Sequence, residues 1–163
     1  MMALVAPPVI YGSWVPNYPR PANRENISTV DFAYELITGG QEGLNTYPSV
    51  PFSNIINVKD VAKAHVLALD APARKDGKPK RLPISIPGLV TSKMTAELLR
   101  KERPELAGRL PPVDLAPPQQ TVAPVDTSFA AEVLGLKEYI PWETTLLETI
   151  DNLVQWEKGS QTA

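Results

Sequence analysis

The pattern of hydrophobic and polar positions predicts short strands separated by amphipathic helices. The segment Ala3–Ile10 (ALVAPPVI) is apolar without alternation, a pattern typical of a strand buried on both faces. Its double proline, Pro7-Pro8, predicts that the strand ends there, because proline cannot donate to a ladder of hydrogen bonds. Two further short strands are expected at residues 52–57 (FSNIIN) and 81–86 (RLPISI).

About four to five helices are predicted by apolar spacing and by capping residues. Ser28 and Asp31 form a variant of the capping box and predict a helix that runs to about Thr38 and stops at Gly39-Gly40. The other expected helices are one capped by Asn57 or Asp60 that ends near Leu69, one capped by Thr91 or Ser92 and interrupted at Pro104, a short one after Asp126-Thr127-Ser128 that ends at Gly135, and one from Pro141 with Leu146, Ile150, Leu153 and Trp156 at helical spacing.

The composition fits one soluble domain. The chain has 163 residues, of which 43% are hydrophobic, and the formal net charge is -2. It has no cysteine, which excludes disulfides and thiolate sites and fits a reducing compartment. A single histidine excludes a histidine-based metal cluster, and we predict no metal site. The 18 prolines predict that much of the chain is irregular but stiff.

Neither a membrane nor a nucleic acid is indicated as a partner. No apolar run approaches the ~20 residues that a membrane helix needs. The N-terminus lacks the basic region of a signal peptide, so a cytoplasmic protein is expected. The cluster Arg74, Lys75, Lys78, Lys80 and Arg81 has no interleaved aromatic residues, which favours a solvated loop over a nucleic-acid surface.

Three segments resemble the extended short-chain dehydrogenase/reductases, in particular the ketone and aldehyde reductases related to dihydroflavonol and cinnamoyl-CoA reductases. Residues 7–12 (PPVIYG) resemble the end of the sixth strand of that family's nucleotide-binding sheet. Residues 56–65 (INVKDVAKAH) resemble a family helix entry and are the most specific of the three. Residues 125–128 (VDTS) with 134–136 (LGL) resemble the family's C-terminal ending, and the order and spacing hold over almost the whole chain.

The catalytic elements of that family have no counterpart in the chain. In the family, a glycine-rich turn after the first strand binds the cofactor pyrophosphate, whereas here the nearest pattern, Gly40-x-x-Gly43, follows a helix and opens no new one. The family's general acid is a tyrosine with a lysine four residues later. None of the tyrosines here has that lysine, and the catalytic serine is missing too. The resemblance therefore implies the C-terminal, substrate-binding half of such an enzyme.

This resemblance implies a fold class and a cofactor. We expect an α/β remnant of a Rossmann-type reductase, with residues 1–163 as one domain and residues 1–12 as the remnant of the sheet. The chain should need no cofactor by itself, and NAD(P) would bind only after complementation by a Rossmann half. By resemblance, Pro7, Pro8 and Val9 would meet the nicotinamide end of that cofactor, and the alternative is a buried strand that ends in a proline turn.

Candidate substrate contacts are aromatic. By resemblance, the loop after Tyr11 and the following helix gather the substrate-contacting side chains, which makes Trp14, Tyr18, Tyr34 and Tyr47 the candidates for lining a pocket.

The candidate catalytic residues have simpler structural explanations. Asp60 and His65 lie roughly 140° apart on a helix, so they form a poor dyad. Asp60 suits a helix cap, and His65 falls on the stripe of Val58 and Val61, where a core position is expected. Asp31 and Glu35 share a helix face and could split into an acid and a base, but a solvated face is the simpler interpretation.

Three functions remain open at this stage. The chain is the substrate-binding portion of a carbonyl reductase, a stand-alone isomerase or cyclase acting on a small molecule, or a non-catalytic binding or scaffold protein. The apolar strand at Ala3–Ile10 would otherwise be an exposed edge. We therefore expect it to be covered in a homo-oligomer or by a separate Rossmann half.

Overall fold

The computed structural model describes residues 2–15, 17, 19–39, 46–48, 52–72, 79–119 and 121–160. Four short strands are present in these ranges: β1 (Ala3–Ala6), β2 (Val9–Tyr11), β3 (Ile55–Asn57) and β4 (Lys80–Pro83). The α-helices are α1 (Asp31–Thr38), α2 (Val58–Leu69), α3 (Ser92–Glu102), α4 (Ser128–Leu134) and α5 (Trp142–Ser160). The 3₁₀ segments are η1 (Arg24–Val30), η2 (Pro104–Arg109) and η3 (Val113–Leu115). This mixed architecture confirms the expected fold class, with few short strands and five α-helices among the described residues.

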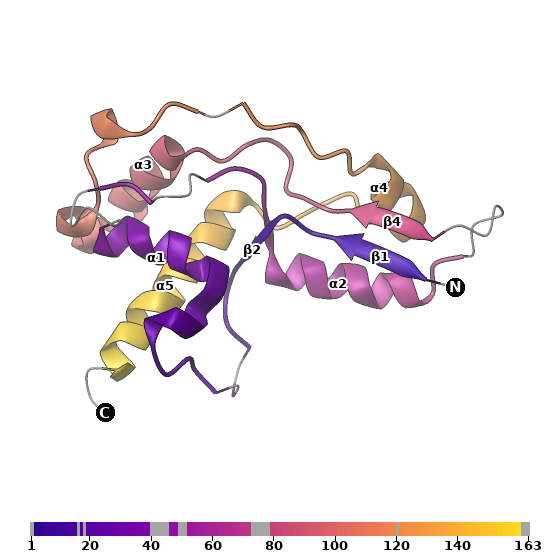
Figure 1. Cartoon of the computed structure of the whole chain (residues 1–163), viewed down its shortest axis with the longest axis horizontal. Coiled ribbons are helices and arrows are strands. Elements are labelled where there is room, and N and C mark those ends of the chain that lie inside the picture. The colour runs from indigo at the N-terminus through magenta and orange to yellow at the C-terminus, as the bar shows by residue number, and fades with distance from the viewer. Residues whose placement is uncertain are drawn as a thin grey trace.

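The strands form two parallel pairs rather than one sheet. β1 pairs with β4, and β2 pairs with β3. Pro7 and Pro8 lie between β1 and β2, where the chain changes from one pair to the other (Figure 1). The prediction that the strand ends at these prolines is confirmed, whereas its burial on both faces is wrong. β1 alternates between half-buried and exposed positions, and Leu4 is 46% exposed. The described residues pair with β1 along one edge only.

The start of the first helix differs from the expected capping box. Residues 24–30 form η1, Ser28 has φ 54° and ψ -137°, and no side chain caps α1. The helix begins at Asp31 with Val30 at its N-cap, so Ser28 lies two residues too early for its hydroxyl to cap α1. The end is as predicted, since Gly39 follows the last helical residue with φ 83°, a conformation that glycine adopts readily.

The other predicted helix starts hold in detail. The Asn57 side chain accepts from Lys59 N at the start of α2, and Thr91 Oγ1 accepts from Met94 N at the start of α3. Asp126 Oδ1 accepts from Ser128 N (2.9 Å) in front of α4, which ends at the left-handed Gly135. Side-chain acceptors of this kind satisfy backbone N–H groups that have no partner inside the helix.

Two groups of buried side chains stabilise the fold, and the helices that carry most of each group lie in different parts of Figure 1. The larger packs α1, α3 and α5 together around Leu36, Leu99 and Ile150. The smaller lies between β4, α2 and α4, around Ile56, Leu82 and Leu134. α5 contacts β2 and β3 as well as α1 and α3, so it joins the strand ends to the larger core. No described helix is long and apolar enough to cross a membrane.

The basic cluster is not uniformly solvated. Lys80 is only 2% exposed, and its ammonium donates to Ala71 O (2.7 Å) just after the end of α2. A lysine in this place satisfies a carbonyl group near the negative end of the helix dipole. Arg81 is exposed, as expected. Arg74, Lys75 and Lys78 lie outside the described residues.

Candidate functional site

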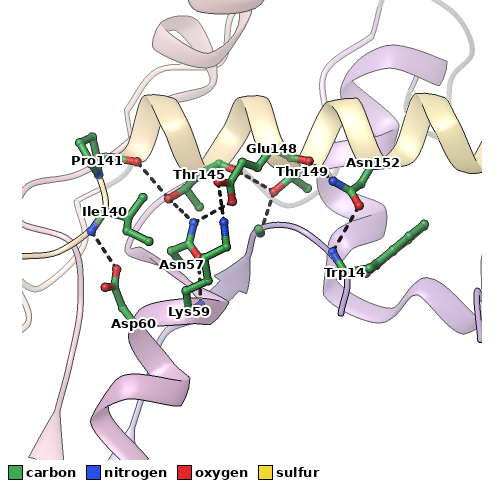
Figure 2. A network of polar contacts seen from close by, with 11 residues as sticks. Trp14, Asn57, Lys59, Asp60, Ile140, Pro141, Thr145, Glu148, Thr149 and Asn152 are labelled. Carbon is green, nitrogen blue, oxygen red and sulfur yellow. Dashed lines mark hydrogen bonds and ion pairs between the residues drawn. The ribbon is translucent and has the colours of Figure 1, made fainter. Parts of the chain in front are cut away.

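The carboxyl ends of β2 and β3 lie side by side under α5, and a polar network joins them (Figure 2). Ligands of open parallel sheets bind outside such strand ends. Here Gly12 N, just after β2, donates to Thr149 Oγ1 (2.8 Å). Asn57, the last residue of β3, donates to Thr145 Oγ1 (3.1 Å) and Glu148 Oε2 (3.4 Å). The network therefore fastens α5 across both strand ends.

Only glycine fits at position 12. Its φ is 129°, and a Cβ atom there would lie 3.0 Å from Val58 Cγ1 and 3.1 Å from Asn57 Oδ1. The tight approach lets the Gly12 amide reach Thr149 while Asn57 caps α2. Asn57 is completely buried, and both the amide nitrogen and the amide oxygen of its side chain have hydrogen-bond partners. Its burial therefore leaves neither group unsatisfied.

An ion pair closes the network on the outside. Lys59 Nζ lies 2.7 Å from Glu148 Oε1. Desolvation favours the neutral form of Glu148, but hydrogen bonds from Lys59 and Asn57 outweigh it and hold the pKa of this carboxyl below its usual value. The carboxylate is thus ionised and fully engaged, which suits a structural clamp rather than a proton acceptor.

Asp60 and His65 do not form a catalytic pair. Asp60 is buried on α2, and its Oδ2 accepts from Ile140 N (2.9 Å), so it fixes the segment that leads into α5 (Figure 2). Desolvation raises the pKa of this carboxyl, even though the hydrogen bond from Ile140 and nearby Lys63 oppose the change. The predicted core position of His65 is wrong: the residue is exposed, and its Nδ1 contacts Val61 O (2.8 Å).

Asp31 and Glu35 meet at one arginine. Arg24 Nε lies 2.5 Å from Asp31 Oδ1, and its Nη2 lies 3.7 Å from Glu35 Oε1. The expectation of a solvated face is wrong for Glu35, which is only 7% exposed because η1 covers this side of α1. Both carboxylates are thus held by the same arginine, which fits a structural role rather than an acid and base pair.

Two of the predicted pocket aromatics converge on Trp156 of α5. The Trp14 and Trp156 rings pack edge to face at 6.4 Å between centroids, and Tyr34 and Trp156 do so at 5.6 Å. Tyr34 Oη donates to Glu157 Oε1 (2.7 Å). Burial and this hydrogen bond raise the pKa of Tyr34 to about 12. The sequence identified Trp156 only by its helical spacing in the last helix.

The other predicted site residues lie elsewhere. Tyr47 donates to Pro112 O (3.1 Å) and does not line the cavity beside Trp156. Tyr18 lies outside the described residues. Pro7, Pro8 and Val9 are half-buried at the point where the chain leaves β1 and enters β2.

A cavity of about 590 Å³ lies beside this aromatic group. Residues 20–22 line one side, and Asn152, Gln155, Trp156 and Gly159 of α5 line the other. The guanidinium of Arg20 lies 4.8 Å from the Trp14 ring centroid. The sequence revealed neither Arg20 nor the role of α5, because nothing in the local pattern shows that residues about 135 positions apart meet. The only available signal was the aromatic residue in each of the two segments.

Two arginine–carboxylate pairs also hold α5, and the sequence did not reveal them either. Arg109 binds Glu157 through two hydrogen bonds (2.9 and 2.6 Å), and Arg103 binds Asp151 in the same way (2.7 and 2.6 Å). Bidentate pairs of this kind are strong and directional.

Comparisons with known proteins give the fold a context. No protein-family model matches the chain. A curated protein, ketoreductase azaE of Aspergillus niger, is 27% identical over 140 residues, which are 83% of this chain and 38% of the ketoreductase.

Solved structures show the same architecture. Gre2 from Candida albicans has a TM-score of 0.70 at 22% identity, over 94% of this chain and 44% of that structure. The yeast methylglyoxal/isovaleraldehyde reductase Gre2, solved with NADPH, has a TM-score of 0.71 at 19% identity, over 94% and 43%. Vestitone reductase from alfalfa has a TM-score of 0.64 at 21% identity, over 97% and 45%.

The chain therefore has the fold of a part of the extended short-chain dehydrogenase/reductases, as its motifs had indicated. It spans less than half the length of the relatives it matches. With the sequence match to a ketoreductase, these likenesses support a reductase lineage.

Proposed function

We propose that the chain is the substrate-binding portion of an NAD(P)H-dependent carbonyl reductase and reduces nothing by itself. The observation that carries this proposal is how much of each chain the matches cover. The matches to reductases extend over most of the length of this chain but over less than half the length of each reductase. The 163 residues contain neither the glycine-rich turn that would bind the cofactor nor the tyrosine and lysine pair that would transfer a proton.

The tyrosines of the chain support the same proposal. A general acid works best when its pKa lies near the working pH. Burial raises the pKa of Tyr11, Tyr34, Tyr47 and Tyr139, so each is moved away from that range. None of the four has the lysine neighbour that would lower its pKa.

The strand pairing supports a missing nucleotide-binding half as the partner. β1 is paired with β4 on one edge, and its Leu4 side chain is exposed. Val66 and Leu69 on α2, which packs against β1, are 64% and 83% exposed. Exposed apolar side chains next to an open strand edge favour strand addition by another polypeptide. A Rossmann half would bring its own parallel strand to this edge and place bound NAD(P)H near Pro7, Pro8 and Val9.

The proposal is tested by isolating the tagged chain from the organism in which it occurs. We expect a co-purifying polypeptide that contains both a glycine-rich turn after its first strand and a Tyr-x-x-x-Lys sequence, and we expect the complex to oxidise NADPH with an aldehyde or ketone. The control is Leu4→Asp combined with Leu69→Asp, which should release the partner. A chain that sediments as a strict monomer at high concentration and recovers no such polypeptide contradicts the proposal.

A further inference from the structure

The cavity beside Trp156 is built by two hydrogen bonds between distant segments. Trp14 N donates to Asn152 Oδ1 (3.3 Å), and Trp156 Nε1 donates to Pro21 O (2.7 Å). Trp14 and Pro21 are thus each attached to α5, and residues 20–22 line the cavity together with that helix. Such attachment keeps the space open before any ligand arrives, which lowers the entropic cost of binding.

The size and walls of the cavity suit a small organic molecule. Its volume of about 590 Å³ lies within the range of ligand sites in proteins. Pro21, Ala22 and the indole of Trp156 provide apolar walls. Rings and other flat apolar groups pack well against an indole and a proline, because both surfaces are broad and rigid.

The charge at the rim comes from Arg20. Its guanidinium stacks near the Trp14 ring, so its position is restrained. The acidic side chains nearby have other partners: Glu157 binds Arg109, and Asp31 binds Arg24. Within the described part of the chain, no carboxylate forms an ion pair with Arg20. A planar guanidinium with free donors binds carboxylates in a two-pronged geometry.

We infer that this cavity binds a ligand that combines a flat apolar body with a carboxylate, the body against Trp156 and the carboxylate on Arg20. Gln155, at the same rim, adds an amide that can donate to the same group. That this ligand is the carbonyl substrate, a keto or aldehyde acid, rests on the proposed function.

The test uses the isolated chain and two probes of nearly equal shape, 2-naphthoate and 2-naphthamide, with binding measured by isothermal titration calorimetry. We expect 2-naphthoate to bind and 2-naphthamide to bind at least about five-fold more weakly, the size of one partly exposed ion pair. Arg20→Gln should remove this preference. Arg81→Gln, which removes another exposed arginine, on β4, should preserve it.

A second variant locates the site. Ala22→Trp places a large side chain at the cavity wall and should weaken both probes, with a melting temperature close to that of the wild type because Ala22 is exposed. Equal binding of the two probes, no binding of 2-naphthoate, or an unchanged preference in Arg20→Gln would overturn the inference. Neither cofactor nor second half is present, so these outcomes are independent of the test of the proposed function.

Discussion

Replacing Gly12 with alanine tests whether the junction of β2, β3 and α5 is as tightly built as the structure shows. The substitution forces a Cβ atom into contact with Val58 and Asn57 at 3.0–3.1 Å. It also puts a side chain on a residue with φ 129°, which costs about 1–3 kcal/mol of backbone strain. If the backbone moves to relieve the contact, the hydrogen bond from Gly12 N to Thr149 weakens, at about 1 kcal/mol.

The free energy of unfolding of Gly12→Ala should therefore fall by about 3 kcal/mol, the sum of strain and the lost hydrogen bond. Two other glycines provide controls. Gly135→Ala has a positive φ but open space around it, so about 1 kcal/mol is expected. Gly108→Ala has neither feature and should change the stability by less than about 0.5 kcal/mol.

The measurement is urea denaturation followed by tryptophan fluorescence, with the unfolding free energy obtained by linear extrapolation. The three substitutions should rank Gly12, Gly135, Gly108 from most to least destabilising. If Gly12→Ala and Gly135→Ala lose the same stability within about 0.5 kcal/mol, the close packing at the strand ends is refuted.

The remaining predictions concern the charged groups around α5. Desolvation raises the pKa of Glu157, but hydrogen bonds from Arg109 and Tyr34 outweigh it and lower this pKa below 4.5 in the folded chain. The stabilising effect of the carboxylate is therefore present above that pH and is lost as the pH falls through the folded pKa. Glu157→Gln should be less stable than the wild type at pH 7, and denaturation curves at pH 7 and pH 3 should show this difference in stability shrinking at the lower pH. Desolvation raises the pKa of Asp60, so protonation of this carboxyl stabilises the fold at low pH, and the gain is lost as the pH rises through the folded pKa. The amide oxygen of Asp60→Asn can still accept from Ile140, so the stability of this variant should match or exceed that of the wild type at pH 7 and lose the advantage in acid. A large loss of stability at pH 7 would contradict this. Arg109→Gln should lower the free energy of unfolding by about 2 kcal/mol in urea denaturation. Adding Glu157→Gln should cause little further loss, because the first substitution has already broken the pair.

Local sequence signals predicted much of the secondary structure. Asn57 and Thr91 cap their helices as expected, Asp126 accepts from Ser128 N in front of α4, and Gly39 and Gly135 end their helices, because such signals act within a few residues of the chain. The predicted capping box at Ser28 is wrong because residues 24–30 form η1, which packs on α1. The capping pattern in the sequence does not reveal this 3₁₀ segment.

Residues whose environment depends on distant segments were harder to predict. Glu35 and Lys80 are buried because η1 and the end of α2 reach them, and His65 is exposed because no described segment covers its side of α2. The aromatic substrate pocket stays a prediction: Trp14 and Tyr34 each pack on Trp156, but neither lines the cavity beside it. Spacing along a helix fixes which residues share a face and does not say what that face contacts.

The central claim, that the chain carries the substrate side of a reductase and none of its redox chemistry, is tested most directly with NADPH. The purified chain is mixed with NADPH and a panel of aldehydes and ketones, and the absorbance of NADPH is followed while its binding is measured by calorimetry. We predict neither binding nor oxidation by the isolated chain, and both after the co-purifying half is added. Oxidation of NADPH by the pure 163-residue chain would contradict the account.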